Sequence, residues 1–329
     1  MYKMEKIRVG ILGCANIAVK YLAPAFKKHH MFDLVGFAGR NYDKTLLISS
    51  QFECLHFESY QLLIDRNDVD LIYIPLPNSL HHEWVIKSLN SGKHVICEKS
   101  LGCSYEEVLE MVDAARLNGK LLFENFQFRF HSQHQFVKKI LEDGGIGEIR
   151  GFRSSFGFPP FNDSYNIRYS SELGGGSLLD AGAYVLKAAD FILGGEFEVR
   201  AATLNVSPDL GIDIYGGIYM QNNEGQFAEL SFGFDNYYQC NYEIWASKGK
   251  LLVTRAFTAP PGFAPSIIVE MQGRKEEIIL PSDDHFEKML SYVVNCIENT
   301  RFEFEYSQNL SQAFKIEKVK NIASNYILK

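Results

Sequence analysis

The sequence lacks several features that would place it in a specialised class of protein. No apolar run approaches the roughly 18 residues of a membrane-spanning helix, and Val9–Leu12 is too short for the core of an export signal. The six cysteines form no C-x-x-C pair and have no histidine spacing of the kind that binds zinc. Basic residues are not in excess, since 33 Lys and Arg face 40 Asp and Glu, for a net charge of -7. We therefore expect a reduced, cytoplasmic protein with no metal site and with neither a membrane nor a nucleic acid as partner.

The chain does contain enough apolar residues for an ordinary folded protein. Of its 329 residues, 46% are hydrophobic and 22% are charged, which is close to the average of globular proteins. At about 100 to 200 residues per domain, this length predicts two domains.

Short β-branched runs alternate with longer amphipathic stretches in residues 1–124. This pattern predicts a doubly wound α/β domain, in which helices cover both faces of a parallel sheet. The predicted strands are Ile7–Leu12, Leu34–Ala38, Leu71–Ile74, His94–Cys97 and Leu121–Glu124. The predicted helices are Ile17–Lys28, Asp43–Phe52, Leu80–Asn90 and Ser104–Asn118, the last opened by a capping box of Ser104 and Glu107.

Residues 125–329 have a different pattern and predict an α+β domain with a large, mainly antiparallel open sheet. Ser132 and Gln135 are expected to cap a short helix that ends near Gly144, and alternating strands follow from Ile149 to about Ile279. The strand candidates include Gln226–Phe234, Tyr238–Ala246, Lys250–Thr254 and Ile267–Met271, and two amphipathic stretches close the chain at Asp284–Asn299 and Asn309–Tyr326.

Aromatic residues recur along these strands, among 25 Phe, 17 Tyr and 2 Trp in the whole chain. An open sheet exposes one face, so we expect that face to be buried by self-association into a homodimer or homotetramer. Packing of the aromatic rings within the domain explains the same composition equally well.

The first strand ends in a turn with the character of a dinucleotide-binding site. Gly13-Cys14-Ala15-Asn16-Ile17-Ala18 is a variant of the Gly-x-Gly-x-x-Gly/Ala fingerprint in which Ala15 replaces the second glycine. Small residues let the backbone approach a pyrophosphate, and the following helix offers its unpaired amide groups. The alternative is a tight junction between strand and helix without a ligand. The fingerprint, if functional, identifies residues 1–124 as a Rossmann domain.

The end of the second predicted strand indicates which dinucleotide binds. An NAD site would carry an acidic residue there to accept hydrogen bonds from the ribose, but the segment reads Ala38-Gly39-Arg40-Asn41. The forked cation of Arg40 suits a 2′-phosphate, so Gly39 and Arg40 favour NADP(H) over NAD. A solvated surface arginine is the alternative reading.

Several further segments, in order along the chain, together resemble the Gfo/Idh/MocA oxidoreductases. They are Ile74-Pro75-Leu76-Pro77-Asn78-Ser79-Leu80-His81, Cys97-Glu98-Lys99-Ser100-Leu101, Glu124-Asn125-Phe126-Gln127-Phe128-Arg129-Phe130-His131, Asn166-Ile167-Arg168 and Gly174-Gly175-Gly176-Ser177-Leu178-Leu179-Asp180-Ala181-Gly182-Ala183-Tyr184. Within that family, the chain is most similar to members that act as NDP-hexose 3-ketoreductases.

The resemblance implies roles for individual residues. Lys99 would lie beside the nicotinamide and take part in catalysis, although Ser100 replaces the usual proline after it. The residues implied to contact the cofactor in addition to the first turn, Gly39 and Arg40 are Leu76, Pro77, Asn78, His81, Glu98, Lys99 and Arg168. Ile167 departs from the tryptophan that commonly precedes this arginine. Arg168 pairing with Glu172 is an equally good reading from helical spacing.

The family pattern Asp-x-Gly-x-His appears here with tyrosine in place of histidine, as Asp180-Ala181-Gly182-Ala183-Tyr184. The resemblance implies that Tyr184 is the proton donor. A phenol has an ordinary pKa near 10, and the ammonium group of Lys99 would favour its ionised form, or Lys99 would orient the carbonyl or donate the proton itself. Asp180 lies four residues before Tyr184 on the same helical face, so we expect it to hold a substrate hydroxyl. Structural roles as a core tyrosine and a helix-capping aspartate are the alternatives.

These residues predict an NADP-dependent oxidoreductase that reduces a nucleotide-linked keto-hexose, with Lys99 and Tyr184 as catalytic residues. Lys99, Tyr184 and Asp180 would also bind the sugar. Two other functions are open: dehydrogenation of a free sugar, polyol or cyclic diol, and redox sensing without catalysis, because a dinucleotide fold does not guarantee chemistry.

Overall fold

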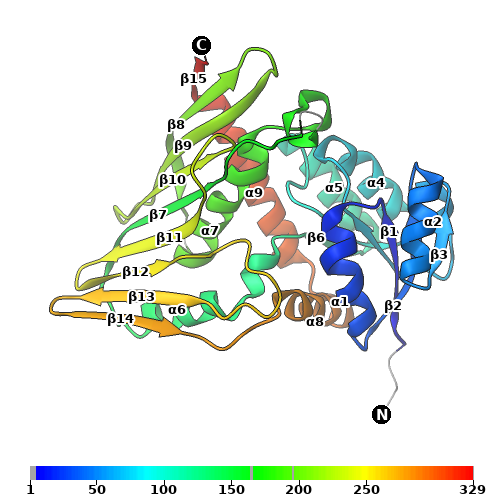
Figure 1. Cartoon of the computed structure of the whole chain (residues 1–329), viewed down its shortest axis with the longest axis horizontal. Helices are drawn as coiled ribbons and strands as arrows, with labels where there is room; N and C mark the ends of the chain where they lie inside the picture. Colours follow the sequence, from blue (N-terminus) through cyan, green and yellow to red (C-terminus); the bar gives the residue numbers. More distant parts are fainter. Residues whose placement is uncertain (1–4, 164–165, 195, 329) are drawn as a thin grey trace. The chain divides into compact units, whose positions relative to one another are not determined.

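The computed structural model describes residues 5–163, 166–194 and 196–328. The chain divides into two compact units (Figure 1). Unit 1 consists of the chain up to Asn125 together with Phe286–Ala313, and unit 2 consists of Phe126–His285 and the chain from Phe314 onward. The assignment of residues 1–124 to the cofactor and 125–329 to the substrate concerns function and stays a prediction.

Unit 1 contains a six-stranded parallel sheet with the strand order β3-β2-β1-β4-β5-β6. The bounds are β1 Ile7–Leu12, β2 Phe32–Ala38, β3 Leu55–Phe57, β4 Leu71–Ile74, β5 His94–Cys97 and β6 Leu122–Glu124. Five of these strands were predicted. β3 was missed because its three residues at the sheet edge are too few to show a period and include the polar His56.

The predicted helical stretches of unit 1 are found, but the short helix α3 Tyr60–Ile64 was not predicted. The helices are η1 Ala18–Leu22, α1 Ala23–Lys28, α2 Tyr42–Gln51, α3, η2 Asn78–Leu80, α4 His81–Asn90 and α5 Tyr105–Asn118, and most of α8 His285–Glu298 and the first part of α9 Glu303–Ile322 join them. The cap of α5 is confirmed in part: Ser104 Oγ accepts from the Glu107 amide at 3.2 Å. The Glu107 carboxylate, however, accepts from the amide of Cys103 at 2.6 Å.

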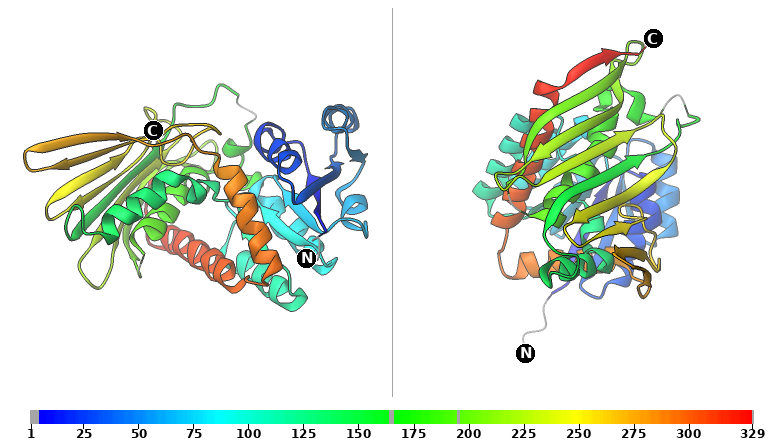
Figure 2. Two further views of the ribbon diagram at one scale, coloured as in Figure 1. Left: turned by 90° about the horizontal axis from the view of Figure 1, so that it is seen from below. Right: turned by 90° about the vertical axis from the view of Figure 1, so that its left-hand side faces the viewer.

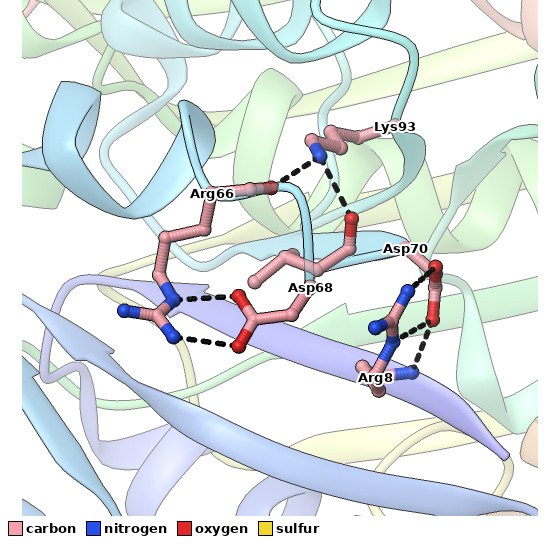
Figure 3. A network of polar contacts seen from close by, with 6 residues as sticks. Arg8, Arg66, Asp68, Asp70 and Lys93 are labelled. Carbon is pink, nitrogen blue, oxygen red and sulfur yellow. Dashed lines mark hydrogen bonds and ion pairs between the residues drawn. The ribbon is translucent and has the colours of Figure 1, made fainter.

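Ion pairs and hydrogen bonds join the amino-terminal ends of the central strands (Figure 3). Arg8 donates to both carboxylate oxygens of Asp70 at 2.8 Å, and Lys93 Nζ donates to the carbonyl oxygens of Arg66 and Val69 at 2.6 and 2.8 Å. Burial alone would raise the pKa of Asp70, but the hydrogen bonds from Arg8 outweigh it and leave the pKa below its usual value. The amino-terminal ends of these strands are thus held together by the ion pair of Arg8 and Asp70 and by the hydrogen bonds from Lys93.

Unit 2 is built on a nine-stranded mixed sheet with the order β14-β13-β12-β11-β7-β10-β9-β8-β15 (Figure 1). The bounds are β7 Ile149–Gly157, β8 Glu198–Ser207, β9 Ile212–Gln221, β10 Phe227–Gly233, β11 Gln239–Ala246, β12 Gly249–Val253, β13 Ser266–Met271, β14 Arg274–Ile279 and β15 Ser324–Ile327. The pairs β10–β7 and β15–β8 are parallel and the others antiparallel. The predicted mainly antiparallel sheet is confirmed.

The long helices of unit 2, α6 Ser132–Glu142, α7 Ala183–Leu193 and the last part of α9, lie against one face of this sheet (Figure 2). The short helices are η3 Gln127–Phe130, η4 Ile167–Tyr169, η5 Ser171–Leu173 and η6 Leu178–Gly182. Phe152, Phe156 and Phe232 are buried on that face, whereas Tyr215, Tyr219 and Trp245 remain exposed. Packing within the domain therefore accounts for many of the aromatic rings.

Two local predictions in this part of the chain were wrong. The residue before α6 is His131, whose side chain accepts from the Gln133 amide at 3.3 Å, so Ser132 does not cap the helix. The Ser132 amide instead donates to Asp283 at 2.7 Å, a partner too distant in sequence to foresee. The expected stretch Asn309–Tyr326 is also not one element, because α9 starts at Glu303 and ends at Ile322 before β15.

Among the described residues, the helices are too short or too polar for any of them to cross a lipid bilayer.

Candidate active site

The turn after β1 has the backbone that a dinucleotide requires. Gly13 has a φ of 101°, and a Cβ atom there would lie 2.9 Å from Cδ2 of Leu76. The Gly13 amide donates to the carbonyl of Ala38 at 2.7 Å, which places the turn beside the end of β2. Cys14 and Ala15 follow directly, and Asn16 and Ile17 begin the helix that leads into η1. Only glycine combines this φ with so close a neighbour.

The end of β2 brings the predicted phosphate-binding arginine next to this turn. Gly39 is buried, and a Cβ there would lie 2.2 Å from Oγ1 of Thr45 in α2. Arg40 is exposed and is hydrogen-bonded to the side chain of Tyr60. The ring of Tyr60 is buried and packs edge-on against that of Trp84, with 4.9 Å between the ring centroids. The pKa of Tyr60 is raised by burial, with Arg40 opposing the rise.

Leu76, Pro77 and Asn78 form the loop after β4, and His81 anchors that loop from beneath. The His81 ring is fully buried, with Nδ1 2.8 Å from the Ser100 carbonyl and Nε2 2.8 Å from the Leu76 carbonyl. Burial lowers the pKa of His81 against the effect of these carbonyls, and a neutral ring has one N–H to share between them. His81 thus connects the loops that follow β4 and β5.

Glu98 and Lys99 lie at the carboxyl end of β5. Glu98 Oε1 accepts from the Tyr73 hydroxyl and from Asn125 Nδ2, each at 2.7 Å. Burial raises the pKa of Glu98, and the two hydrogen bonds oppose that rise. Lys99 is partly exposed directly after it, and the peptide bond to Ser100 is cis.

Tyr184 lies at the start of α7 with its ring in an aromatic cluster. Its ring centroid is 5.2 to 5.9 Å from those of Phe126, Phe128, Phe156 and Phe257. Only 7% of the residue is exposed. The ring is thus a core element, as the structural alternative held, and the four neighbours restrict where its hydroxyl can point.

Arg168 and Asp180 form an ion pair beside this tyrosine. Arg168 Nε donates to Asp180 Oδ2 at 2.7 Å, so the partner of Arg168 is Asp180 and not the sequence neighbour considered earlier. The pKa of Arg168 is raised, mainly by the charge of Asp180 and also by that of ionised Tyr184. The three residues form one cluster in unit 2.

The structure thus groups the predicted residues by unit. Those of unit 1 gather at the carboxyl ends of the parallel strands, where ligands bind in such sheets, and Tyr184, Asp180 and Arg168 gather in unit 2. Sequence reasoning missed Tyr60, which lies twenty residues from Arg40 and has no local motif. It also gave no role to Asn125, although that residue lies in a recognised segment.

The residues of unit 1 fit a dinucleotide. A turn that only glycine can adopt, a helix beginning directly after it and an exposed arginine in place of an acid suit a phosphorylated ligand. Asn125 Oδ1 is buried without a hydrogen-bond partner among the described residues, while its Nδ2 is engaged with Glu98. A ligand that donates a hydrogen bond would satisfy this acceptor. Within the described residues, no cluster of three or more His, Cys, Asp or Glu side chains could hold a metal.

Comparison with known proteins relates both parts of the chain to one family. Residues 7–126 match an oxidoreductase family with an NAD-binding Rossmann fold, and residues 134–252 match the GFO/IDH/MocA C-terminal domain.

Individual relatives are similar over nearly the whole length. The dTDP-3,4-didehydro-2,6-dideoxy-alpha-D-glucose 3-reductase of Saccharopolyspora spinosa is 38% identical over 287 residues, which cover 87% of this chain and 86% of that protein. The enzyme of the same name from Actinomadura kijaniata is 36% identical, with 95% of each chain covered. A crystal structure of KijD10, a 3-ketoreductase from Actinomadura kijaniata in complex with NADP and TDP-benzene, has a TM-score of 0.95 at 35% identity and covers 99% of this chain and 100% of that one. By these matches, the protein belongs to the Gfo/Idh/MocA oxidoreductase family.

Proposed function

We propose that this protein is an NADP(H)-dependent reductase of a nucleotide-linked keto-hexose, in which Lys99 and Tyr184 are the catalytic residues. The observation that carries the proposal is the cluster of Tyr184, Asp180 and Arg168, because it combines a proton donor with a charged pair suited to a polyhydroxylated ligand.

The cofactor is NADP(H). Arg40 follows β2 where an acid would favour NAD, and Tyr60 supports it by a hydrogen bond. Gly13 to Ile17 would receive the pyrophosphate, with Leu76, Pro77, Asn78 and Glu98 along the same strand ends. Solved structures of KijD10 contain NADP, which supports the same choice.

Reduction of a ketone needs a hydride and a proton. The cofactor, when bound, supplies the hydride. Tyr184 donates the proton to the developing alkoxide, and the guanidinium of Arg168 stabilises the negative charge left on the phenol. Lys99 orients the carbonyl, favours the ionised tyrosine or donates directly, and these three roles remain open. The aromatic neighbours of Tyr184 exclude water from its ring.

Asp180 positions the sugar together with Arg168. An ionised carboxylate only accepts hydrogen bonds, so it suits a sugar hydroxyl, and its pairing with Arg168 fixes the direction in which its oxygens point. The sequence pattern predicted that Arg168 contacts the cofactor. We propose instead that its main role is to orient Asp180 and to stabilise the charge on Tyr184.

The substrate class follows from the relatives. The two similar enzymes are named for reduction at C3 of a dTDP-linked 2,6-dideoxy sugar. A dTDP-3-keto-deoxyhexose is therefore the substrate we propose for this chain. The test is consumption of NADPH by the purified protein on addition of this sugar nucleotide, with the reduced sugar identified by NMR.

Competing functions have their own outcomes in that experiment. Turnover of free sugars, polyols or cyclic diols with NADP+ in preference to the sugar nucleotide would favour the dehydrogenase. Tight NADPH binding without hydride transfer to any sugar would favour a redox sensor and contradict the proposed reaction.

The open face of the nine-stranded sheet is proposed to join copies of this chain. Tyr215, Tyr219 and Trp245 are exposed there beside the ion pair of Arg153 and Glu229. The expected result is a dimer or tetramer by light scattering that weakens in Trp245→Glu; a monomeric wild type would contradict it. We also place the protein in the cytoplasm, because its six cysteines are free thiols.

A further inference from the structure

The glycine-rich segment before η6 folds back on the carbonyl group of Arg168. The amide of Gly176 donates to that carbonyl at 3.0 Å, and the amide of Gly175 donates to the Ser170 carbonyl at 2.9 Å. A Cβ on Gly175 would lie 2.4 Å from the Arg168 oxygen, so the approach requires glycine. Arg168 is therefore fixed at its backbone by this turn and at its side chain by Asp180.

The helix that carries Asp180 and Tyr184 has no local cap. Ser177 precedes η6, but its side chain caps no amide of the helix. Instead its hydroxyl donates to Oδ2 of Asp213 at 2.6 Å, and the amide of Leu178 donates to the same oxygen at 2.6 Å. Asp213 belongs to β9, so a strand of the sheet provides the acceptor that a capping residue usually provides.

Glycine at position 176 makes this contact possible. Gly176 has a φ of 111°, and a Cβ there would lie 2.5 Å from Oδ1 of Asp213. Burial raises the pKa of Asp213, and the hydrogen bonds from Ser177 and Leu178 oppose the rise. In either protonation state Asp213 keeps a carboxyl oxygen that accepts, so the contact depends on the acceptor rather than on the charge.

We infer that Asp213 is a positioning residue, which fixes the start of the helix carrying Asp180 and Tyr184 to the sheet through Ser177 and Leu178. The inference rests on the proposed function for its catalytic consequence. Loss of the acceptor frees the first turn of the helix, and the carboxylate and phenol groups then lose their common alignment.

The variants are Asp213→Ala, Asp213→Asn and, as matched control, Asp209→Ala in the exposed turn of the same β8–β9 hairpin. Asp213→Ala should lower kcat for the keto sugar about tenfold or more, because small displacements of catalytic groups are costly. The KM for NADPH should stay unchanged, since Gly13 and Arg40 belong to unit 1. Asp213→Asn keeps an acceptor oxygen and should restore most of kcat, and Asp209→Ala should match the wild type.

A second measurement does not depend on the reaction. Hydrogen exchange followed by mass spectrometry should show faster exchange of residues 176–184 in Asp213→Ala and not in Asp209→Ala. If the wild type reduces no sugar nucleotide, the proposed function fails, and this measurement still decides the role of Asp213.

Three results would overturn the inference: a kcat within about twofold of the wild type in Asp213→Ala, equal impairment of Asp213→Asn and Asp213→Ala, or unchanged exchange of residues 176–184. If Asp213→Ala does not fold, Ser177→Ala replaces it, and a kcat equal to that of the wild type in Ser177→Ala contradicts the inference.

Discussion

The proposed cofactor residues of unit 1 and the proposed substrate residues of unit 2 are held by different kinds of contact. In unit 1 the proposed cofactor residues follow neighbouring strands of a parallel sheet, so their placement repeats one local rule, the loop after the strand end. In unit 2 the cluster of Arg168, Asp180 and Tyr184 depends on a glycine turn and on Asp213 from another strand. The placement of the unit 1 residues therefore follows from local loop geometry, whereas that of the unit 2 residues depends on contacts between distant segments.

The strongest test of this difference is removal of the proton donor in unit 2. Tyr184→Phe should lower kcat about 10² to 10⁴-fold, because a positioned general acid contributes about that much. NADPH affinity, measured by fluorescence titration, should not change, because the proposed cofactor residues belong to unit 1. Tyr237→Phe, at a tyrosine that is 87% exposed and lies outside the proposed site, is the control and should keep its activity. Equal turnover by Tyr184→Phe and the wild type would eliminate the proposed role.

Acid should affect the stability of the two units over different pH ranges. His94 in unit 1 has a pKa lowered to about 4, mainly by burial, and its Nδ1 accepts from the Leu121 amide at 3.0 Å. The unfolded chain protonates this histidine near pH 6.5, so its contribution is present above that pH and is lost as the pH falls toward 4. The loss is up to about 3 kcal/mol, at about 1.4 kcal/mol per pKa unit.

In unit 2, His134 has a pKa lowered to about 3, mainly by burial. The stability that its neutral ring contributes therefore continues to decrease at pH values below 4. Calorimetry of the wild type between pH 7.5 and about 3 covers both ranges. His94→Gln keeps an acceptor for Leu121 but does not titrate, and it should flatten the pH dependence between 6.5 and 4. An unchanged profile in this variant would show that His94 is not the cause.

Gly13→Ala should impair the proposed cofactor residues of unit 1 without changing the cluster of unit 2. The new Cβ combines a φ of 101°, which strains any residue but glycine, with a contact of 2.9 Å to Cδ2 of Leu76, so the turn or the Leu76 side chain must shift. We expect NADPH to bind at least about tenfold more weakly. Gly92→Ala is the matched control, since Gly92 also has a positive φ, of 75°, but has open space around it. If both variants bind NADPH as the wild type does, the turn does not contact the cofactor.

The smallest expected effects concern the choice of cofactor. Arg40→Ser should raise the KM for NADPH about tenfold and leave that for NADH unchanged, because only NADPH carries the 2′-phosphate. Tyr60→Phe removes one hydrogen bond to Arg40 and should raise the KM for NADPH about threefold. Steady-state kinetics with both cofactors checks this. Equal increases of the KM for NADPH and of that for NADH would mean that these residues stabilise the fold and do not bind the 2′-phosphate.

Sequence reasoning reached the features whose cause is local. The strands β1, β4 and β5 were predicted with their bounds because apolar runs end at turn residues, and the Ser104 cap followed from its spacing. The motifs at Gly13, Lys99 and Tyr184 likewise lie in single segments. The partner of Arg168 was not predicted, because helical spacing favoured Glu172 and the turn at Gly175 brings Asp180 closer. Asp213 and Tyr60 act through contacts between distant segments, which no pattern in one sequence reveals.

The charged network of Arg8, Asp70 and Lys93 has a consequence for engineering coenzyme preference. It lies at the amino-terminal ends of the strands, whereas Gly39 and Arg40 follow the opposite end of β2. Replacing the exposed Arg40 by the acidic residue of an NAD-type site therefore leaves these ion pairs untouched, whereas the buried Gly39 must stay, because a Cβ there would lie 2.2 Å from Oγ1 of Thr45. The proposed selectivity residue and the charged support of the sheet thus lie at opposite ends of the strands, so Arg40 can be redesigned without changing that support.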